Sequence, residues 1–286
     1  MKKIVALLVS ICLMLSLATP AFAAKTSGAA STLRLESTVG SVKLKNAAGR
    51  NLKITGGVRL YNGYKLSTQK ASYAYISLDD NKAVKLDAST NSEVFQSGKK
   101  LELKVNSGQI FFNVSEPLKA DETLTIRTST MVTGVRGTCG WVEAVNRNTT
   151  RISLLEGKLA VTSTDPVTQD QRTIIIVGGE TATIVYHGEE TGQDSDTPVE
   201  DETIQDLIDS GVIREEHIIA SDTGLTVEKL QEEDVPGAVA VEVKKDPALQ
   251  QRIEEDTRLS VPEIIGDAET RLDEEETQAV KEDEEV

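Results

Sequence analysis

The sequence predicts an all-β protein: many short strands in a β-sandwich or β-roll (solenoid-like) domain, followed by an acidic, partly helical C-terminal tail. Two observations support this. From about Leu33 to Tyr186, apolar and polar residues alternate in short runs broken by glycine, asparagine and aspartate, which is typical of half-buried strands joined by turns. Past His187 the composition becomes acidic. We expect a signal peptide at 1–23, a β-domain at 33–188, an acidic linker at 189–201, a partly helical acidic region at 202–272 and a disordered acidic tail at 273–286.

The N-terminus has the features of an export signal. Lys2 and Lys3 precede an apolar run from Ile4 to Leu17, and Ala21-Phe22-Ala23 has the small-x-small pattern of a signal peptidase site. The run is shorter than the roughly 20 residues that span a bilayer. We therefore expect a mature chain without a transmembrane helix, secreted or associated with the cell surface. Whether it stays in the wall, the medium or a periplasm is left open.

Three segments illustrate the strand pattern. Residues 72–78 alternate, with Ala74 and Ile76 on one face and Tyr73 and Tyr75 on the other. The apolar positions of 101–105 and 110–114 flank Asn106-Ser107-Gly108, which predicts a hairpin. Residues 174–177 are apolar on both faces, which predicts a strand covered on both sides.

The tail offers three helical candidates. One apolar face runs from Ile204 to Val212, a second helix is predicted from Pro247 to Arg258, and a third from Val261 to Val280. Pro262 suits the first turn of that third helix.

Charge is divided unevenly along the chain. Residues 189–286 contain 32 acidic and 8 basic residues, a net charge of −24, and the signal contributes +2; since the whole chain carries −15, residues 24–188 carry +7. We expect the acidic tail to be a solvated, partly helical extension that repels itself. Alternatively, it binds cations or a basic partner, keeps the protein soluble, or is attracted to its own basic body.

The motifs of the body resemble those of the FecR domain, the extracytoplasmic β-domain of the ferric citrate regulator. The matching blocks occur in family order: Val39-Gly40-Ser41-Val42, Gly63-Tyr64-Lys65-Leu66-Ser67-Thr68, Ser72-Tyr73-Ala74-Tyr75-Ile76-Ser77-Leu78-Asp79, Val135-Arg136-Gly137-Thr138 and Leu155-Glu156-Gly157-Lys158-Leu159-Ala160-Val161. The resemblance implies an extracytoplasmic domain for protein or ligand contact, without enzymatic activity.

Two departures from the family pattern matter. The chain begins with an expected cleavable signal instead of a cytoplasmic anti-sigma segment and a membrane helix, so we do not expect a direct anti-sigma role. The family tends to place an aromatic residue two positions after the threonine of its Val-Arg-Gly-Thr block, whereas this chain has Gly140, with Trp141 beside it. Local packing is therefore expected to differ there.

The candidate binding residues are Arg136, Tyr73, Tyr75 and Trp141. The guanidinium of Arg136 suits an anionic ligand or a partner carboxylate, or it fixes its own loop by pairing internally. The two tyrosines can stack on sugars or form a protein hot spot, or simply cover a sheet face.

Cys139 is the only cysteine of the expected mature chain, so it cannot form an internal disulfide. It is a buried structural residue, a cross-link to a partner or a reactive thiol. A thiol nucleophile needs a neighbouring base or cation, and His187 and His217 are the only histidines. We favour burial.

No recognisable catalytic or phosphate-binding motif is present, and no metal site or cofactor is predicted. The acidic charge argues against nucleic acid as a partner. We expect a non-catalytic binding or scaffolding module that contacts an envelope or extracellular protein or a wall polymer and contributes to extracytoplasmic signalling. The alternatives are a ligand or glycan sensor that uses the tyrosine face, and a thiol-dependent enzyme or disulfide-linked protein.

Overall fold

The computed structural model describes residues 33–79, 82–114, 122–164, 171–186 and 224–284. They all lie in one compact unit, Ser31–Val286. The expected signal peptide, the linker at 189–201, the helical candidate at 204–212 and both histidines lie outside the described residues.

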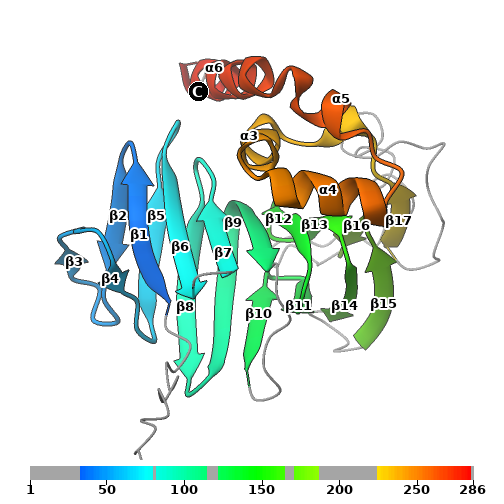
Figure 1. Cartoon of the computed structure of the whole chain (residues 1–286). Coiled ribbons are helices and arrows are strands. Elements are labelled where there is room, and N and C mark those ends of the chain that lie inside the picture. The colour runs from blue at the N-terminus through cyan, green and yellow to red at the C-terminus, as the bar shows by residue number, and fades with distance from the viewer. Residues whose placement is uncertain (1–32, 80–81, 115–121, 165–170, 187–223, 285–286) are drawn as a thin grey trace, which may run out of the picture. The chain divides into compact units, whose positions relative to one another are not determined.

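The predicted all-β body is confirmed: strands dominate the described residues and the helices lie at the C-terminal end (Figure 1). Sheet A has the strand order β4–β1–β6–β7–β9–β12–β13–β16–β17, and sheet B has the order β3–β2–β5–β8–β9–β10–β11–β14–β15. The strands are β1 (Arg34–Val39), β2 (Val42–Lys45), β3 (Asn51–Leu52), β4 (Val58–Arg59), β5 (Tyr64–Thr68), β6 (Tyr73–Asp79), β7 (Lys82–Leu86), β8 (Asn91–Ser97), β9 (Lys100–Val114), β10 (Thr123–Arg127), β11 (Met131–Val135), β12 (Cys139–Ala144), β13 (Thr149–Glu156), β14 (Lys158–Thr164), β15 (Gln171–Val177), β16 (Glu180–Val185) and β17 (Leu225–Lys229).

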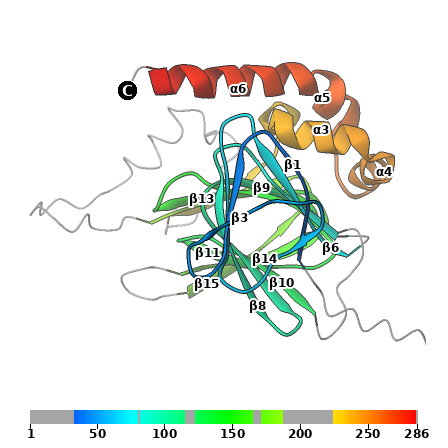
Figure 2. The same cartoon turned by 90° about the vertical axis from the view of Figure 1, so that its left-hand side faces the viewer.

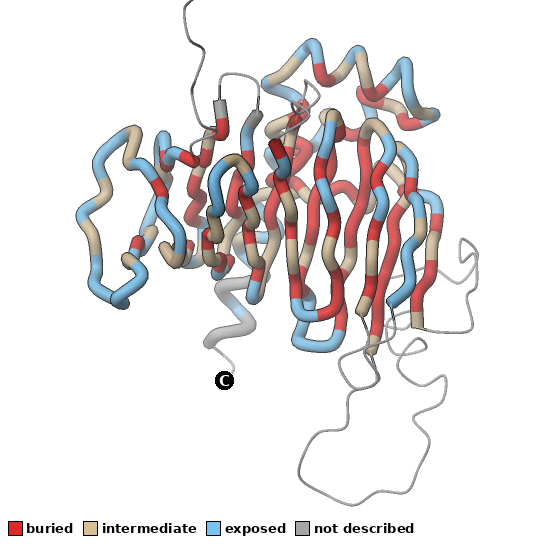
Figure 3. Tube along the Cα trace, turned by 90° about the horizontal axis from the view of Figure 1, so that it is seen from below, coloured by how far each residue is buried: buried red, intermediate tan, exposed pale blue. Residues whose placement is uncertain are grey.

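The inner faces of the two sheets enclose one apolar core. Ala74 and Ile76 of β6 point into it, as the alternation predicts, together with Leu103 of β9 and Val161 of β14. Buried and exposed positions follow one another along the strands (Figure 3), because successive side chains of a strand point to opposite faces.

Strand β9 corrects the predicted hairpin. The chain does not reverse at Asn106-Ser107-Gly108 but continues as one strand of 15 residues. Its first half pairs with β8 and β10 in sheet B, and its second half pairs with β7 and β12 in sheet A. Gly108 marks the crossing: its φ is +84°, and a Cβ there would lie 2.7 Å from Thr90 Cα. Gly108, which had predicted a turn, therefore marks a bend where β9 passes from sheet B to sheet A.

Strand β15 corrects a second prediction. Its residues are apolar on both faces, but β15 is an edge strand that pairs with β14. Ile176 is buried, whereas Ile175 and Val177 are 59% and 41% exposed. The apolar run at 174–177 is covered on one face only.

The C-terminal region adds a final strand and a layer of helices. β17 pairs with β16 and extends sheet A. The one-turn helix η2 (Glu232–Asp234) follows, and then come α3 (Gly237–Lys245), α4 (Pro247–Asp256), α5 (Val261–Gly266) and α6 (Ala268–Glu284). We call α3–α6 the helical cap; it lies on one side of the strands (Figure 2).

The predicted helix from Pro247 matches α4, where Asp246 caps the N-terminus by accepting hydrogen bonds from the N–H groups of Ala248 and Leu249. The third candidate is divided into α5 and α6 at Asp267. The sequence predicts disorder from residue 273, whereas the structure describes α6 as helical through Glu284. Within the described residues, no helix has both the length and the apolar character needed to cross a membrane.

Candidate functional site

The outer face of sheet A and the helical cap form an interface that contains four of the five candidate residues. Strand alternation turns Tyr73 and Tyr75 of β6 and Cys139 and Trp141 of β12 away from the inner core, toward the cap. Their apolar partners include Phe111 and Leu155 from the sheet and Val239, Val243, Leu249, Ile253, Ile264 and Ala268 from the cap. This second core attaches the helices to the sheet by burying apolar surface.

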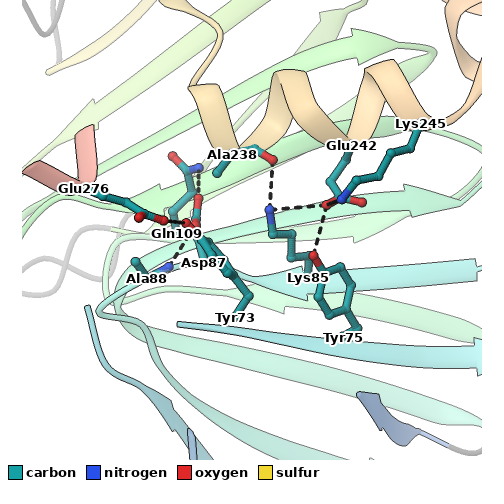
Figure 4. Close-up of polar contacts among 10 residues, drawn as sticks. All are labelled: Tyr73, Tyr75, Lys85, Asp87, Ala88, Gln109, Ala238, Glu242, Lys245 and Glu276. Atoms are coloured by element: carbon teal, nitrogen blue, oxygen red, sulfur yellow. Dashed lines mark hydrogen bonds and ion pairs between the residues drawn. The ribbon is translucent and has the colours of Figure 1, made fainter. Parts of the chain in front are cut away.

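Lys85 of β7 is the polar centre of this interface (Figure 4). Only 5% of the residue is exposed, and its Nζ donates a hydrogen bond of 2.9 Å to the carbonyl oxygen of Ala238 in α3. The same nitrogen lies 3.4 Å from Glu242 Oε1 and 4.4 Å from the centre of the Tyr73 ring. The buried charge is therefore compensated by a carbonyl, a carboxylate and an aromatic face.

Tyr73 and Tyr75 lie on one face of β6, as predicted, but the cap covers that face. Tyr73 is 7% exposed and donates a short hydrogen bond to Glu276 of α6, and Tyr75 donates one of 3.2 Å to Glu242. Desolvation, followed by the neighbouring Glu242 charge, raises the pKa of Tyr75 to about 12. Desolvation and the hydrogen bond to Glu276 raise the pKa of Tyr73 further. Both hydroxyls therefore stay protonated and act as donors.

A cavity of about 540 Å³ lies beside Tyr73, where the cap meets the sheet. Asp87, Gln109, Glu275 and Glu276 contribute to its lining. Burial raises the pKa of Asp87, although the Lys85 charge and hydrogen bonds from the Ala88 N–H and Gln109 act in the opposite direction. Burial also raises the pKa of Glu275, which accepts a hydrogen bond from the Gly237 N–H. The lining is thus rich in carboxyl groups, two of which, Asp87 and Glu275, are harder to ionise than usual.

The last family block, at residues 155–161, is a docking point for α4. Glu156 accepts a hydrogen bond of 2.9 Å from Arg252 Nε, and the Gly157 N–H donates one of 2.6 Å to Asp256. Gly157 has φ +92°, and a Cβ there would lie 2.8 Å from the carbonyl oxygen of Gly137. The Arg136-Gly137-Thr138 and Glu156-Gly157 turns are therefore in contact, and glycine is required at Gly157.

Gly140 lies where the neighbouring strands leave no room for a side chain. A Cβ at this position would overlap the carbonyl oxygen of Ser153, and it would lie 3.2 Å from the Phe112 ring. Phe112, on the paired strand β9, is fully buried against this position. A side chain at position 140 would therefore clash with the paired strands on both sides, which explains the glycine there.

Cys139 and Trp141 are both buried in the second core. Desolvation, followed by the charge of Glu156, raises the pKa of the Cys139 thiol well above its ordinary value, which disfavours the thiolate needed for nucleophilic chemistry. The Trp141 indole N–H has no hydrogen-bond acceptor among the described residues. The structure thus places these two residues in the packing between sheet A and the helical cap.

Arg136 is separate from this interface. It is exposed, directly after β11, and forms no ion pair with any described residue. The internal pairing that we considered from the sequence is not present in the described part, so its guanidinium faces solvent.

The residues that hold the cap in place were missed by the sequence analysis. Lys85 sits at an ordinary outward strand position between Val84 and Leu86, and nothing local distinguishes it from a solvated lysine. Arg252 pairs with Glu156 across 96 positions of sequence. The one available signal was global, namely the opposite charges of body and tail.

These observations define a two-sheet β-domain whose own C-terminal helices close one sheet face. Among the described residues, no group of three or more histidine, cysteine or acidic side chains is arranged to hold a metal ion. The interface can hold helices and donate hydrogen bonds, but its thiol and its phenols are protonated.

Residues 64–160 match the family model described as FecR protein, which confirms the resemblance inferred from the motifs. Two crystal structures of a "putative anti-sigma factor" from Parabacteroides distasonis ATCC 8503 are similar, each with 19% identity, a TM-score of 0.36 and coverage of 43% of this chain. The match spans 55% and 56% of those chains, so about half of their length. The comparison with curated proteins found no match.

Proposed function

We propose that the protein is a non-catalytic FecR-like binding or scaffolding module, secreted or held at the cell surface, that contributes to extracytoplasmic signalling. Its partner is an envelope or extracellular protein or a wall polymer. The FecR match supports a regulatory role of this kind. The export signal expected at residues 1–23 supports the location.

One observation carries the non-catalytic part of the proposal: the chain's own cap fills the sheet face that bears the candidate reactive groups. Cys139 is completely buried and its thiol resists ionisation, and Tyr73 is engaged with Glu276. A substrate would have to displace the cap to reach the Cys139 thiol. Binding through the surfaces that the cap leaves open requires no such rearrangement.

The test is recovery of a partner by the mature chain. A tagged protein covering residues 24–286 is incubated with envelope extract and cross-linked, and the bound material is identified by mass spectrometry. A β-sandwich protein of similar size and charge serves as the control bait. We expect enrichment of a defined envelope component over the control, and recovery of nothing above the control would contradict the proposal. Immunodetection in cell fractions tests the location, and a signal confined to the cytoplasm would contradict it.

The cavity beside Tyr73 favours a second candidate function, a ligand sensor. Its carboxyl-rich lining suits a ligand with hydroxyl or ammonium groups, because carboxylates accept hydrogen bonds from both. Such a ligand would signal by shifting the cap between docked and released states, which requires different affinities for the two. Loss of ligand binding in a Tyr73→Ala, Tyr75→Ala variant is expected, and unchanged glycan binding would remove the sensor hypothesis.

A further inference from the structure

The outer face of sheet B differs in character from that of sheet A. The cap packs on sheet A through the second core, whereas the outward positions of β2, β5, β8, β9 and β10 are exposed or half-buried. The basic residues at these positions and on the outward side of β14 are Lys43, Lys45, Lys65, Lys100, Lys104, Arg127 and Lys158, and the acidic ones are Glu93 and Glu102. This face is positive in a chain whose net charge is −15.

Strand register aligns five of these residues in a single line across the sheet. Lys45 is paired with Lys65, Lys65 with Glu93, Glu93 with Lys104, and Lys104 with Arg127. We call this line the cationic row. At the usual separation of neighbouring strands it is about 19 Å long, with a side chain roughly every 4.8 Å.

The row is not neutralised within the described part of the chain. Glu93 lies 3.7 Å from Lys65, and Glu102 forms a two-pronged ion pair with Arg127. Lys45 and Lys104 form no ion pair with described residues. Two pairs of like charges, Lys45 with Lys65 and Lys104 with Arg127, stand directly opposite each other, an arrangement that is unfavourable by itself.

We propose that the outer face of sheet B binds a linear anionic polysaccharide, one with carboxylate or phosphate groups on its repeating units, lying across the strands along the cationic row. This inference rests on the proposed binding function and names the chemical class of the partner. A polyanion would relieve the repulsion between the like-charged pairs. The even spacing over about 19 Å suits a polymer. The line of paired residues continues past Arg127 through Val132 to Thr162 and Thr173, and the hydroxyls of these two threonines can bond to sugars.

The test uses the mature chain, residues 24–286, with polygalacturonate as the carboxylate probe, poly(glycerol phosphate) as the phosphate probe and neutral dextran as the blank. Dissociation constants are measured by affinity electrophoresis at 50 mM and 300 mM salt. We expect binding to at least one of the charged polymers and not to dextran, with weaker binding at high salt because exposed charges are screened. Binding to neither charged polymer at 50 mM salt would overturn the proposal, as would equal binding to dextran.

A matched pair of variants locates the site. Lys45→Glu, Lys104→Glu reverses two unpaired charges of the row. Arg34→Glu, Arg59→Glu reverses a like-charged pair of exposed residues that also stand opposite each other, but in sheet A. Both change the net charge equally. We expect at least about a tenfold loss of affinity for the first variant and less than about a twofold loss for the second. Equal losses of affinity would show that net charge alone governs binding and would overturn the assignment of the binding site to the cationic row.

Two further binding measurements distinguish the polysaccharide from other possible ligands of this face. A peptide of residues 189–202 tests whether the chain's own acidic segment is the preferred ligand of this face. Tighter binding of that peptide than of either polymer would show that it is. A single-stranded DNA oligonucleotide that binds more tightly than both polymers would overturn the polysaccharide assignment. Recovery of a protein partner by the row variant, together with absent polymer binding by the wild type, would refute this inference and leave the proposed function standing.

Discussion

Lys85→Ala should loosen the helical cap more than the same change at an exposed strand lysine such as Lys65. The substitution removes the hydrogen bond of 2.9 Å from Lys85 Nζ to the Ala238 carbonyl, and a hydrogen bond from a charged group contributes about 1.5–3 kcal/mol. It removes the contact with the Tyr73 ring at 4.4 Å, a loss of about 0.5–2 kcal/mol. Glu242 keeps Lys245 at 3.0 Å and Tyr75 at 3.2 Å, so it is not left unpaired.

Together these losses predict a decrease of about 3 kcal/mol in the free energy of unfolding. The assay is urea denaturation followed by circular dichroism, combined with hydrogen exchange of the amides of α3. A loss of this size corresponds to an increase of roughly 100-fold in the opening of the cap, if opening is local. Lys85→Met tests the charge separately, because it keeps most of the side-chain volume and should cost less than Lys85→Ala.

Lys65→Ala is the matched control. Lys65 is also a strand lysine with an acidic neighbour, but its side chain is 57% exposed and the ion pair spans 3.7 Å, so its loss should cost less than about 1 kcal/mol. Equal effects of Lys85→Ala and Lys65→Ala, or unchanged exchange in α3, would refute the reasoning that Lys85 anchors the cap.

Three other predictions concern groups buried under the helical cap or in the inner core. Burial raises the pKa of Asp87 and Glu275, so between the ordinary and the raised pKa values the folded state holds protons that the unfolded state has lost, and the free energy of unfolding should fall as pH rises through that window. A series of denaturation curves at different pH should show a flatter profile for Asp87→Asn than for the wild type. An unchanged slope would contradict this. Cys139 should not react with a thiol reagent such as DTNB until urea unfolds the protein, whereas fast labelling under native conditions would refute its burial. Gly140→Ala should lower the free energy of unfolding by about 1–3 kcal/mol, because overpacking has that cost. Denaturation measures this loss against Gly134→Ala, where a Cβ meets no atom within 4 Å. Equal stability of the two variants would show that the site at Gly140 can relax.

The strands were predictable because their signal is local. Alternation along β6 correctly separates Ala74 and Ile76 from Tyr73 and Tyr75. The prediction failed for β9, where a glycine between two alternating runs has the same appearance in a bend as in a hairpin turn. Only the pairing partners, which come from distant segments, distinguish the two.

The candidate site was harder to predict because it depends on contacts far apart in sequence. The alternation shows that Tyr73 and Tyr75 share a face, but not that this face is covered, since Tyr73 and its partner Glu276 are separated by 203 positions. The opposite charges of body and tail made an attraction between them one of several possibilities, without giving its location. The cap uses few of those charges: Lys85 with Glu242 and Glu156 with Arg252 lie at the interface, and most of its contact is apolar.

The continuity of β9 has a consequence for how the protein unfolds. One unbroken strand supplies hydrogen bonds to both sheets, so neither sheet can be lost without removing a central strand of the other. The β-domain should therefore open as a single cooperative unit, with no populated state that keeps one sheet and melts the other. Its slowest-exchanging amides should lie on both halves of β9, and the helical cap should exchange earlier.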